Sequence, residues 1–167
     1  NDPDEPVITV PVTLAVDSTS STMEIEIDYL AGWNLVGLPL EVEDASYNIL
    51  FPESIGGTLY SYDGAYVPES YLTFGEGYWL RFNNAGSTTI TGTPINELTI
   101  SLSEGWNLVS GISETVSIYS ISDPDGIIVS GTLYGYDMAY VPSEELIAGK
   151  GYWLRAYEDG EITLTSG

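Results

Sequence analysis

The chain contains neither cysteine nor histidine among its 167 residues. Without cysteine there is no disulfide framework, no thiol nucleophile and no thiolate metal site. Without histidine, Ser–His and Cys–His catalytic pairs and histidine-based zinc sites are excluded as well. These two absences remove most classes of hydrolase.

Basic residues are almost absent too. Arg81, Lys150 and Arg155 stand against 25 acidic residues, which gives a formal net charge of −22. Such a charge repels the phosphates of nucleic acids and the head groups of anionic lipids. We therefore expect no nucleic-acid partner and no membrane insertion, and we expect cations such as calcium, or basic protein surfaces, to be attracted instead.

Long hydrophobic runs are also missing, and none approaches the about 18 residues that cross a bilayer as a helix. The chain begins with no basic, apolar leader, so any signal peptide is expected upstream of Asn1. What the chain does have is 43% hydrophobic residues, including 13 tyrosines. This composition is too apolar for an intrinsically disordered acidic segment and predicts a folded core.

The strongest positive signal is an internal repeat. The segment 57–68 reads GTLYSYDGAYVP, and the segment 131–142 reads GTLYGYDMAYVP. Two flanking motifs recur in the same order, GWNLV at 32–36 and 105–109, and GYWLR at 77–81 and 151–155. Three motifs repeated at nearly constant spacing predict two units of the same topology related by pseudo-twofold symmetry.

The periodicity within each unit is that of β-strands. Ile25, Ile27 and Tyr29 alternate with acidic residues, as a half-buried strand requires. We predict an all-β fold of two tandem pseudo-symmetric units, 23–93 and 94–167, with about five strands each, packed as a β-sandwich or barrel-like pair. The segments 33–38 and 106–109 are apolar on both faces, so they are predicted to be covered central strands.

Little helix is expected. Asp44 is a candidate cap for a short helix over 45–50, and Ser143 for another that ends at Gly149. Asp63 and Gly64 form a typical two-residue hairpin turn, which favours positive φ at glycine. Because Met138 replaces this glycine in the second copy and methionine resists positive φ, we expect a type I turn or a longer loop instead.

The repeated motifs resemble a duplicated GWNL/GYW module found near the ends of large secreted or surface-anchored bacterial and archaeal proteins. The resemblance covers nearly everything from residue 24 onward and implies an extracellular accessory module without catalytic residues. The run VITVPVTLAV and the residues before it, 1–16, resemble the closing strand of an Ig-like β-sandwich domain. The Ser/Thr-rich segment 17–22 is interpreted as a linker.

Two of the three basic residues recur beside a tryptophan, in the pairs Trp79/Arg81 and Trp153/Arg155. An aromatic ring with a guanidinium beside it suits stacking on a sugar or gripping a carboxylate. The alternative, which recurrence in both halves favours, is a packed tryptophan covered by an arginine stem.

Tyrosines form a second candidate set, available to glycans or peptides through their polar tips. Plain cross-strand packing is the favoured alternative. The candidates are Tyr62, Tyr66, Tyr136 and Tyr140, with Tyr60 and Tyr134 beside them.

Carboxylates offer weaker candidates. Asp123 and Asp125 alternate before a glycine, as calcium ligands do, although an ordinary Asp-Pro-Asp-Gly turn is favoured. An aspartic-protease dyad needs an Asp-Thr/Ser-Gly turn in each half, whereas Asp17-Ser18-Thr19 lacks the glycine and has no second copy. A carboxylate-pair glycosidase stays open because acids are abundant, yet nothing singles out a pair.

Taken together, these features predict a non-catalytic extracellular or cell-surface accessory module that serves adhesion or attachment to carbohydrate. Its expected partner is a glycan or an extracellular protein. It needs no cofactor, with calcium as the one candidate ion. The alternatives are a structural spacer or C-terminal cap without a ligand, and a carboxylate-dependent hydrolase.

Overall fold

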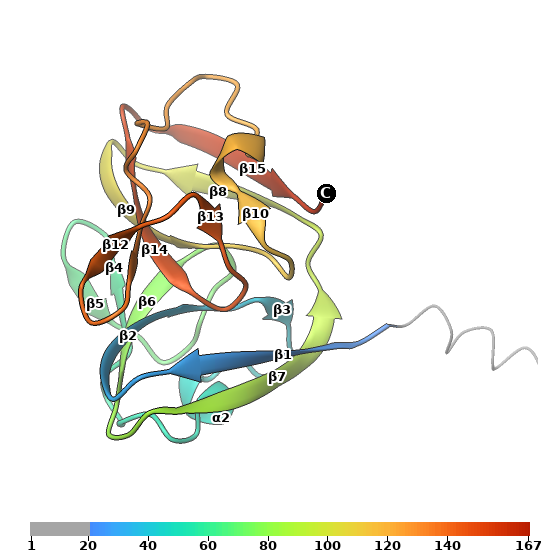
Figure 1. Cartoon of the computed structure of the whole chain (residues 1–167), viewed down its shortest axis with the longest axis vertical. Helices are drawn as coiled ribbons and strands as arrows, with labels where there is room; N and C mark the ends of the chain where they lie inside the picture. The colour runs from blue at the N-terminus through green and yellow to red at the C-terminus, as the bar shows by residue number, and fades with distance from the viewer. Residues whose placement is uncertain (1–20) are drawn as a thin grey trace, which may run out of the picture.

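The computed structural model describes residues 21–167, which form 15 strands in antiparallel sheets. The strands divide into two halves, β1–β7 and β8–β15, drawn in blue to green and in yellow to red in Figure 1. The all-β prediction is therefore confirmed. The predicted strand within 1–16, most of the predicted linker and the string Asp17-Ser18-Thr19 lie outside the described residues.

The first half contains a four-stranded sheet of order β2-β6-β4-β5 and a three-stranded sheet of order β1-β7-β3. Its elements are β1 (Met23–Tyr29), β2 (Gly32–Gly37), β3 (Leu40–Glu41), α2 (Tyr47–Leu50), β4 (Tyr60–Tyr62), β5 (Tyr66–Pro68), β6 (Gly77–Phe82) and β7 (Gly86–Pro94).

The second half repeats this plan with a four-stranded sheet of order β12-β11-β14-β9 and a pair β15-β8. A further short pair, β10-β13, belongs to this half alone. Its elements are β8 (Glu97–Leu102), β9 (Gly105–Ser110), β10 (Val116–Ser117), η2 (Ile118–Ser120), β11 (Tyr134–Tyr136), β12 (Tyr140–Pro142), β13 (Glu145–Leu146), β14 (Gly151–Ala156) and β15 (Gly160–Thr165). Each half thus has more than the five strands expected, because strands of two or three residues, such as β3 and β5, carry too little sequence pattern to be recognised.

The strand registers of the two halves are the same at every repeated motif. Trp33 lies opposite Arg81 as Trp106 lies opposite Arg155, and Tyr60 pairs with Trp79 as Tyr134 pairs with Trp153. The predicted equivalence of the two copies is therefore confirmed at the level of strand pairing.

Each half has its own hydrophobic core between its sheets. In the first half Ile27 and Tyr29 of β1 are buried with Phe82 of β6, while the acidic residues of β1 face outward, as the period-two pattern predicted. Tyr29 stacks on Phe82 with ring centroids 3.7 Å apart. The second core contains the equivalent residues Ile100, Leu102 and Ala156. Two separate cores explain why the halves are distinct units.

The predicted central position of the GWNLV strands is wrong. β2 and β9 are edge strands of their four-stranded sheets. Residues 35–38 are nevertheless buried: Val36 and Leu38 lie in the first core, and the free edge of β2 faces the other half, where Val36 forms a bridge with Lys150. The tryptophan at the start of each strand lies beyond this cover, so Trp33 is 41% and Trp106 is 43% exposed.

The two predicted short helices have different outcomes. In the first half α2 forms over Tyr47–Leu50, but its N-cap is Ser46 and not Asp44 as predicted; Asp44 instead accepts hydrogen bonds from the backbone N–H and the hydroxyl of Ser46. In the second half, the predicted helix from Ser143 to Gly149 is wrong. Glu145 and Leu146 form strand β13, which pairs with β10 and buries Leu146 in the second core.

Each repeated hairpin turns through a three-residue loop, longer than the two-residue turn. Asp63 donates its N–H to the carbonyl of Ala65. Both central residues have positive φ, 76° for Gly64 and 63° for Met138. The premise that methionine would avoid this conformation is therefore wrong: the flanking strand pairs impose it. Among residues 21–167, no helix has the length and apolarity needed to cross a membrane.

Candidate functional site

The GWN motif is built to present its tryptophan. Gly32 has φ of 93°, which an L side chain rarely adopts, and turns the chain into β2. The Asn34 side chain accepts the Leu30 N–H at 2.9 Å and donates to the Leu30 carbonyl at 2.8 Å, which closes the turn. Asn107 makes the same pair of bonds to Ser103. The tryptophan between the glycine and the asparagine is thereby held at the surface.

The GYWLR motif places its residues on two faces of one strand. Tyr78 and Leu80 are buried in the core, whereas Trp79 is half-buried and Arg81 is exposed on the opposite face. The Tyr78 hydroxyl accepts the Thr73 N–H at 2.7 Å, and burial of the phenol raises its pKa. Tyr152 is held in the same way by the Ile147 N–H at 2.9 Å. The core tyrosine therefore anchors the strand that carries the outward-facing tryptophan.

The backbones of the two halves approach closely along a pseudo-twofold axis. Gly37 donates its N–H to the Gly149 carbonyl at 3.1 Å, and the equivalent Ser110 donates to the Gly75 carbonyl at 3.0 Å. A Cβ on Gly77 would lie 2.6 Å from the Val109 carbonyl oxygen, so only glycine permits this approach. These reciprocal contacts are what a two-fold interface requires.

Aromatic rings cross between the halves in the same reciprocal way. Tyr62 of the first half packs edge-on against Trp153 of the second, and Tyr136 packs against Trp79, both with ring centroids 4.9 Å apart. Within each half the two tryptophans are nearly perpendicular, with Trp33 6.3 Å from Trp79. The tryptophan and tyrosine sets, treated separately in the sequence, form one aromatic cluster.

This cluster surrounds two open pockets that are equivalent under the pseudo-symmetry. Both are lined only by tryptophan and tyrosine, and their volumes are 520 Å³ and 550 Å³. We call them the C pocket, lined by Tyr62, Tyr66, Trp106, Tyr134, Tyr140 and Trp153, and the N pocket, lined by Trp33, Tyr60, Tyr66, Trp79, Tyr136 and Tyr140.

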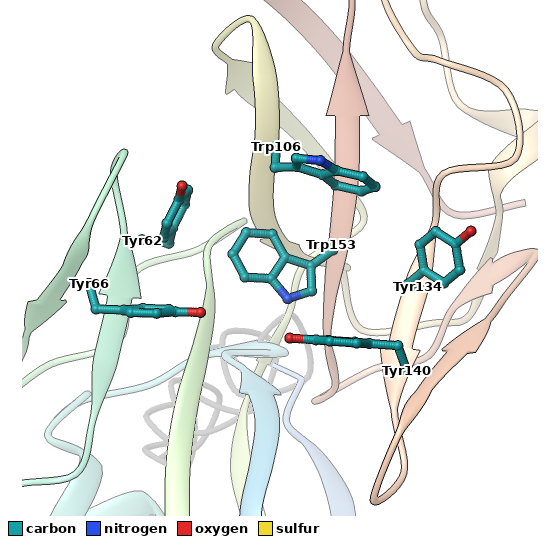
Figure 2. A pocket seen from close by; sticks show the side chains of 6 residues that line it. All are labelled: Tyr62, Tyr66, Trp106, Tyr134, Tyr140 and Trp153. Atoms are coloured by element: carbon teal, nitrogen blue, oxygen red, sulfur yellow. The ribbon is translucent and has the colours of Figure 1, made fainter.

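Figure 2 shows how the C pocket is shaped. Trp106 and Tyr140 are seen nearly edge-on, above and below Trp153, whose ring faces the viewer between them. Tyr134 also turns its ring face outward, and Tyr62 and Tyr66 close the opposite side. The pocket thus has aromatic walls and an aromatic floor, so that a flat ligand can contact ring faces on more than one side.

Polar atoms gather at the boundary between the two pockets. The hydroxyls of Tyr66 and Tyr140 point toward one another below Trp153. The Trp153 Nε1 atom is buried and has no hydrogen-bond partner within 21–167. Partial burial, followed by the neighbouring Tyr66 and Tyr136, raises the pKa of the Tyr140 phenol, which contact with Trp153 opposes. The Tyr140 phenol therefore stays a neutral group that can donate and accept hydrogen bonds.

The two arginines lie at the outer rims of the pockets. Arg81 is exposed, and its guanidinium lies 6.0 Å from the ring centroid of Trp33, its cross-strand neighbour. It therefore covers Trp33 rather than Trp79, the partner that the sequence suggested. Arg155 holds the equivalent position opposite Trp106 and is also exposed.

The candidate calcium ligands have other partners. The Asp123 carboxylate accepts the backbone N–H groups of Ile127 at 2.9 Å and Ile128 at 3.0 Å, which organises the turn before them. Asp125 is exposed. Within the described part of the chain, no three acidic side chains gather as metal ligands would. The geometry is that of the Asp-Pro-Asp-Gly turn.

All eight aromatic and arginine candidates from the sequence lie in or beside the two pockets. Trp33 and Trp106 were missed, because a tryptophan inside an apolar run was assigned to the core. The available signal was that each follows a glycine and precedes an asparagine, a turn sequence that places the residue near a strand end.

Comparison of the chain with protein-family models, with curated proteins and with solved structures finds no match. The function must therefore be argued from the site itself.

Proposed function

We propose that the protein is a non-catalytic extracellular accessory module that attaches a larger secreted or surface protein to an uncharged glycan. The paired aromatic pockets hold the sugar rings. The observation that carries this proposal is that two equivalent surface pockets are lined only by tryptophan and tyrosine.

The size and chemistry of the pockets support a sugar as the ligand. Volumes of 520 Å³ and 550 Å³ fall within the about 300–1,000 Å³ of small-molecule sites. Aromatic faces pack against the C–H faces of sugar rings, and tyrosine hydroxyls supply donors and acceptors for the sugar hydroxyls. The hydroxyls of Tyr66 and Tyr140 point toward one another, so a sugar hydroxyl placed between them can hydrogen-bond to both.

Charge selects among glycans. A net charge of −22 repels acidic polysaccharides at long range, and two arginines at the pocket rims do not offset it. An uncharged polymer is not repelled, and Arg81 and Arg155 lie where they can donate hydrogen bonds to its hydroxyls. We therefore expect neutral hexose, pentose or N-acetylhexosamine chains to bind and uronic acid chains to bind weakly.

The lining also supports a binding role without catalysis. General acid–base chemistry near neutral pH needs groups that titrate there. The pockets offer only indoles and phenols, and the Tyr140 phenol has its pKa raised further from neutrality. A glycosidase would need two carboxyl groups facing the sugar, and neither pocket is lined by one.

One observation favours the spacer alternative. Trp79 and Trp153 pack against tyrosines of the opposite half, so part of the aromatic cluster stabilises the pairing of the two halves. Trp33 and Trp106 do not share this role. Their aromatic contacts lie within their own half, and about two-fifths of each is exposed. They are therefore the residues that separate binding from structure.

Affinity electrophoresis tests the proposal in gels that contain hydroxyethylcellulose, xylan, galactomannan or glycol chitin, with alginate as the acidic control. At least one neutral polymer should retard the wild-type protein, and the double variant Trp33→Ala/Trp106→Ala should migrate as it does without polymer. Tyr71→Ala is the matched control, since Tyr71 is 62% exposed and lines neither pocket. Unretarded wild type in all four neutral gels, or a double variant retarded like wild type, would refute glycan attachment.

A further inference from the structure

We propose that the module is divalent: each pocket holds its own segment of uncharged glycan, and the protein bridges two identical segments at once. This inference rests on the proposed function and extends it to the way in which the two pockets are used.

The two pockets are fixed relative to one another. Each takes residues from both halves, so neither half can move without deforming both sites. The crossing contacts of Tyr62 with Trp153 and of Tyr136 with Trp79, together with the Gly37 and Ser110 backbone bonds, hold the halves together. When two sites are held at a fixed separation, the second binding event becomes intramolecular and overall attachment strengthens greatly.

The symmetry determines which ligands fit. The strand bridges and the tyrosine–tryptophan contacts between the halves are reciprocal, as in an isologous two-fold interface. Because a two-fold axis relates the pockets, the direction in which a ligand lies in one pocket is reversed in the other. A sugar chain has a direction, so one straight chain that crossed both pockets would enter the second one backwards. Two separate segments, one for each pocket, satisfy both sites.

The boundary between the pockets is also shared. Tyr66 and Tyr140 line both pockets and are each 54% exposed. Their hydroxyls point toward one another, so they can hydrogen-bond to the ends of two segments that approach from opposite sides. The module therefore suits surfaces that display many copies of one glycan, such as a polymer sheet or a glycan-coated cell wall.

The chain offers a matched pair of single-site variants for a test. Trp33 lines only the N pocket and Trp106 only the C pocket, and about two-fifths of each is exposed. Trp33→Ala and Trp106→Ala should therefore each remove one site and leave the other intact. Unchanged melting temperatures would confirm that both variants are folded.

Isothermal titration calorimetry gives the stoichiometry directly. The full chain is titrated in turn with cellotriose, xylotriose, mannotriose and triacetylchitotriose. Wild type should bind about two molecules per chain of the sugar that matches the retarding polymer, and each single variant about one, with a dissociation constant within about twofold of wild type. On a chip densely coated with the same sugar, each single variant should lose on the order of 100-fold in apparent affinity.

The outcomes separate the two proposals. One bound trisaccharide per wild-type chain, or loss of all binding in either single variant, would overturn divalency while leaving glycan attachment intact. A double variant that still bound the trisaccharide would overturn glycan attachment through these pockets, and divalency with it.

Discussion

Met138 offers the sharpest stability test, because it holds a conformation that the first copy gives to glycine. Its φ is 63°, where an L residue loses about 1–2 kcal/mol, and no side-chain burial compensates, since Met138 is 76% exposed. Glycine removes this strain but adds about 0.4–1 kcal/mol of conformational freedom to the unfolded chain. Met138→Gly should therefore stabilise the protein by about 0.5–1 kcal/mol, which raises the melting temperature by about 1–4 °C for a chain of this size.

The reverse substitution in the first copy is the matched control. Gly64 has φ of 76°, and a Cβ there meets nothing within 4 Å, so Gly64→Ala tests backbone strain without a steric clash. It should destabilise the protein by about 1 kcal/mol. Differential scanning calorimetry and urea unfolding measure both variants. A melting temperature that falls in Met138→Gly, or that does not change in Gly64→Ala, would refute the argument that the strands impose positive φ.

Three further predictions concern the interface and the acidic side chains. Gly37→Ala should lower stability by about 1–3 kcal/mol, because its Cβ would clash with the Cβ and hydroxyl of Ser110. Adding Ser110→Gly should restore most of the loss, and a Gly37→Ala protein as stable as wild type would contradict this argument. Desolvation, followed by the charges of Glu69 and Asp63, raises the pKa of Glu76 above its ordinary value of 4.5. The folded protein therefore binds this proton more tightly than the unfolded chain does. It loses stability as the pH rises from 4.5 through the raised pKa of the folded state. Glu76→Gln should therefore stabilise the protein at neutral pH in urea unfolding, and a gain that persisted unchanged below pH 4.5 would contradict that cause. Asp123→Ala should cost about 1–3 kcal/mol through two lost backbone hydrogen bonds, whereas a chelator should leave the melting temperature unchanged; a chelator-induced drop would point to bound calcium instead.

Much of the fold follows from the sequence because its signals are repeated and local. The alternation of Ile25, Ile27 and Tyr29 fixed β1, and the duplicated motifs required two units with the same strand pairing. The predictions are wrong where a tertiary contact overrides the local sequence pattern. Ser143 and the acids after it look like a helix start, but Leu146 gains more by burial in the second core as part of β13.

The site could be predicted only in its composition. The sequence pointed to the repeated tryptophans and tyrosines, but nothing in it states that Tyr62 reaches Trp153 of the other copy. That contact depends on glycines such as Gly77 that let two backbones approach, and close approach has no periodic signature. Trp33 was misplaced because the apolar run after it is buried, in part within the first core and in part against the other half, whereas Trp33 itself is exposed.

The Gly37–Ser110 contact shows that the two copies are no longer interchangeable. These residues hold the same place in each repeat and meet at the axis, where the serine hydroxyl also donates to the Glu76 carbonyl at 2.8 Å. A pair made of two first halves would place glycine against glycine, leaving a gap and no serine hydroxyl at this point. A pair made of two second halves would force serine against serine. The interface therefore pairs a glycine with a serine at its centre, so each half is complementary to the other half and not to a second copy of itself.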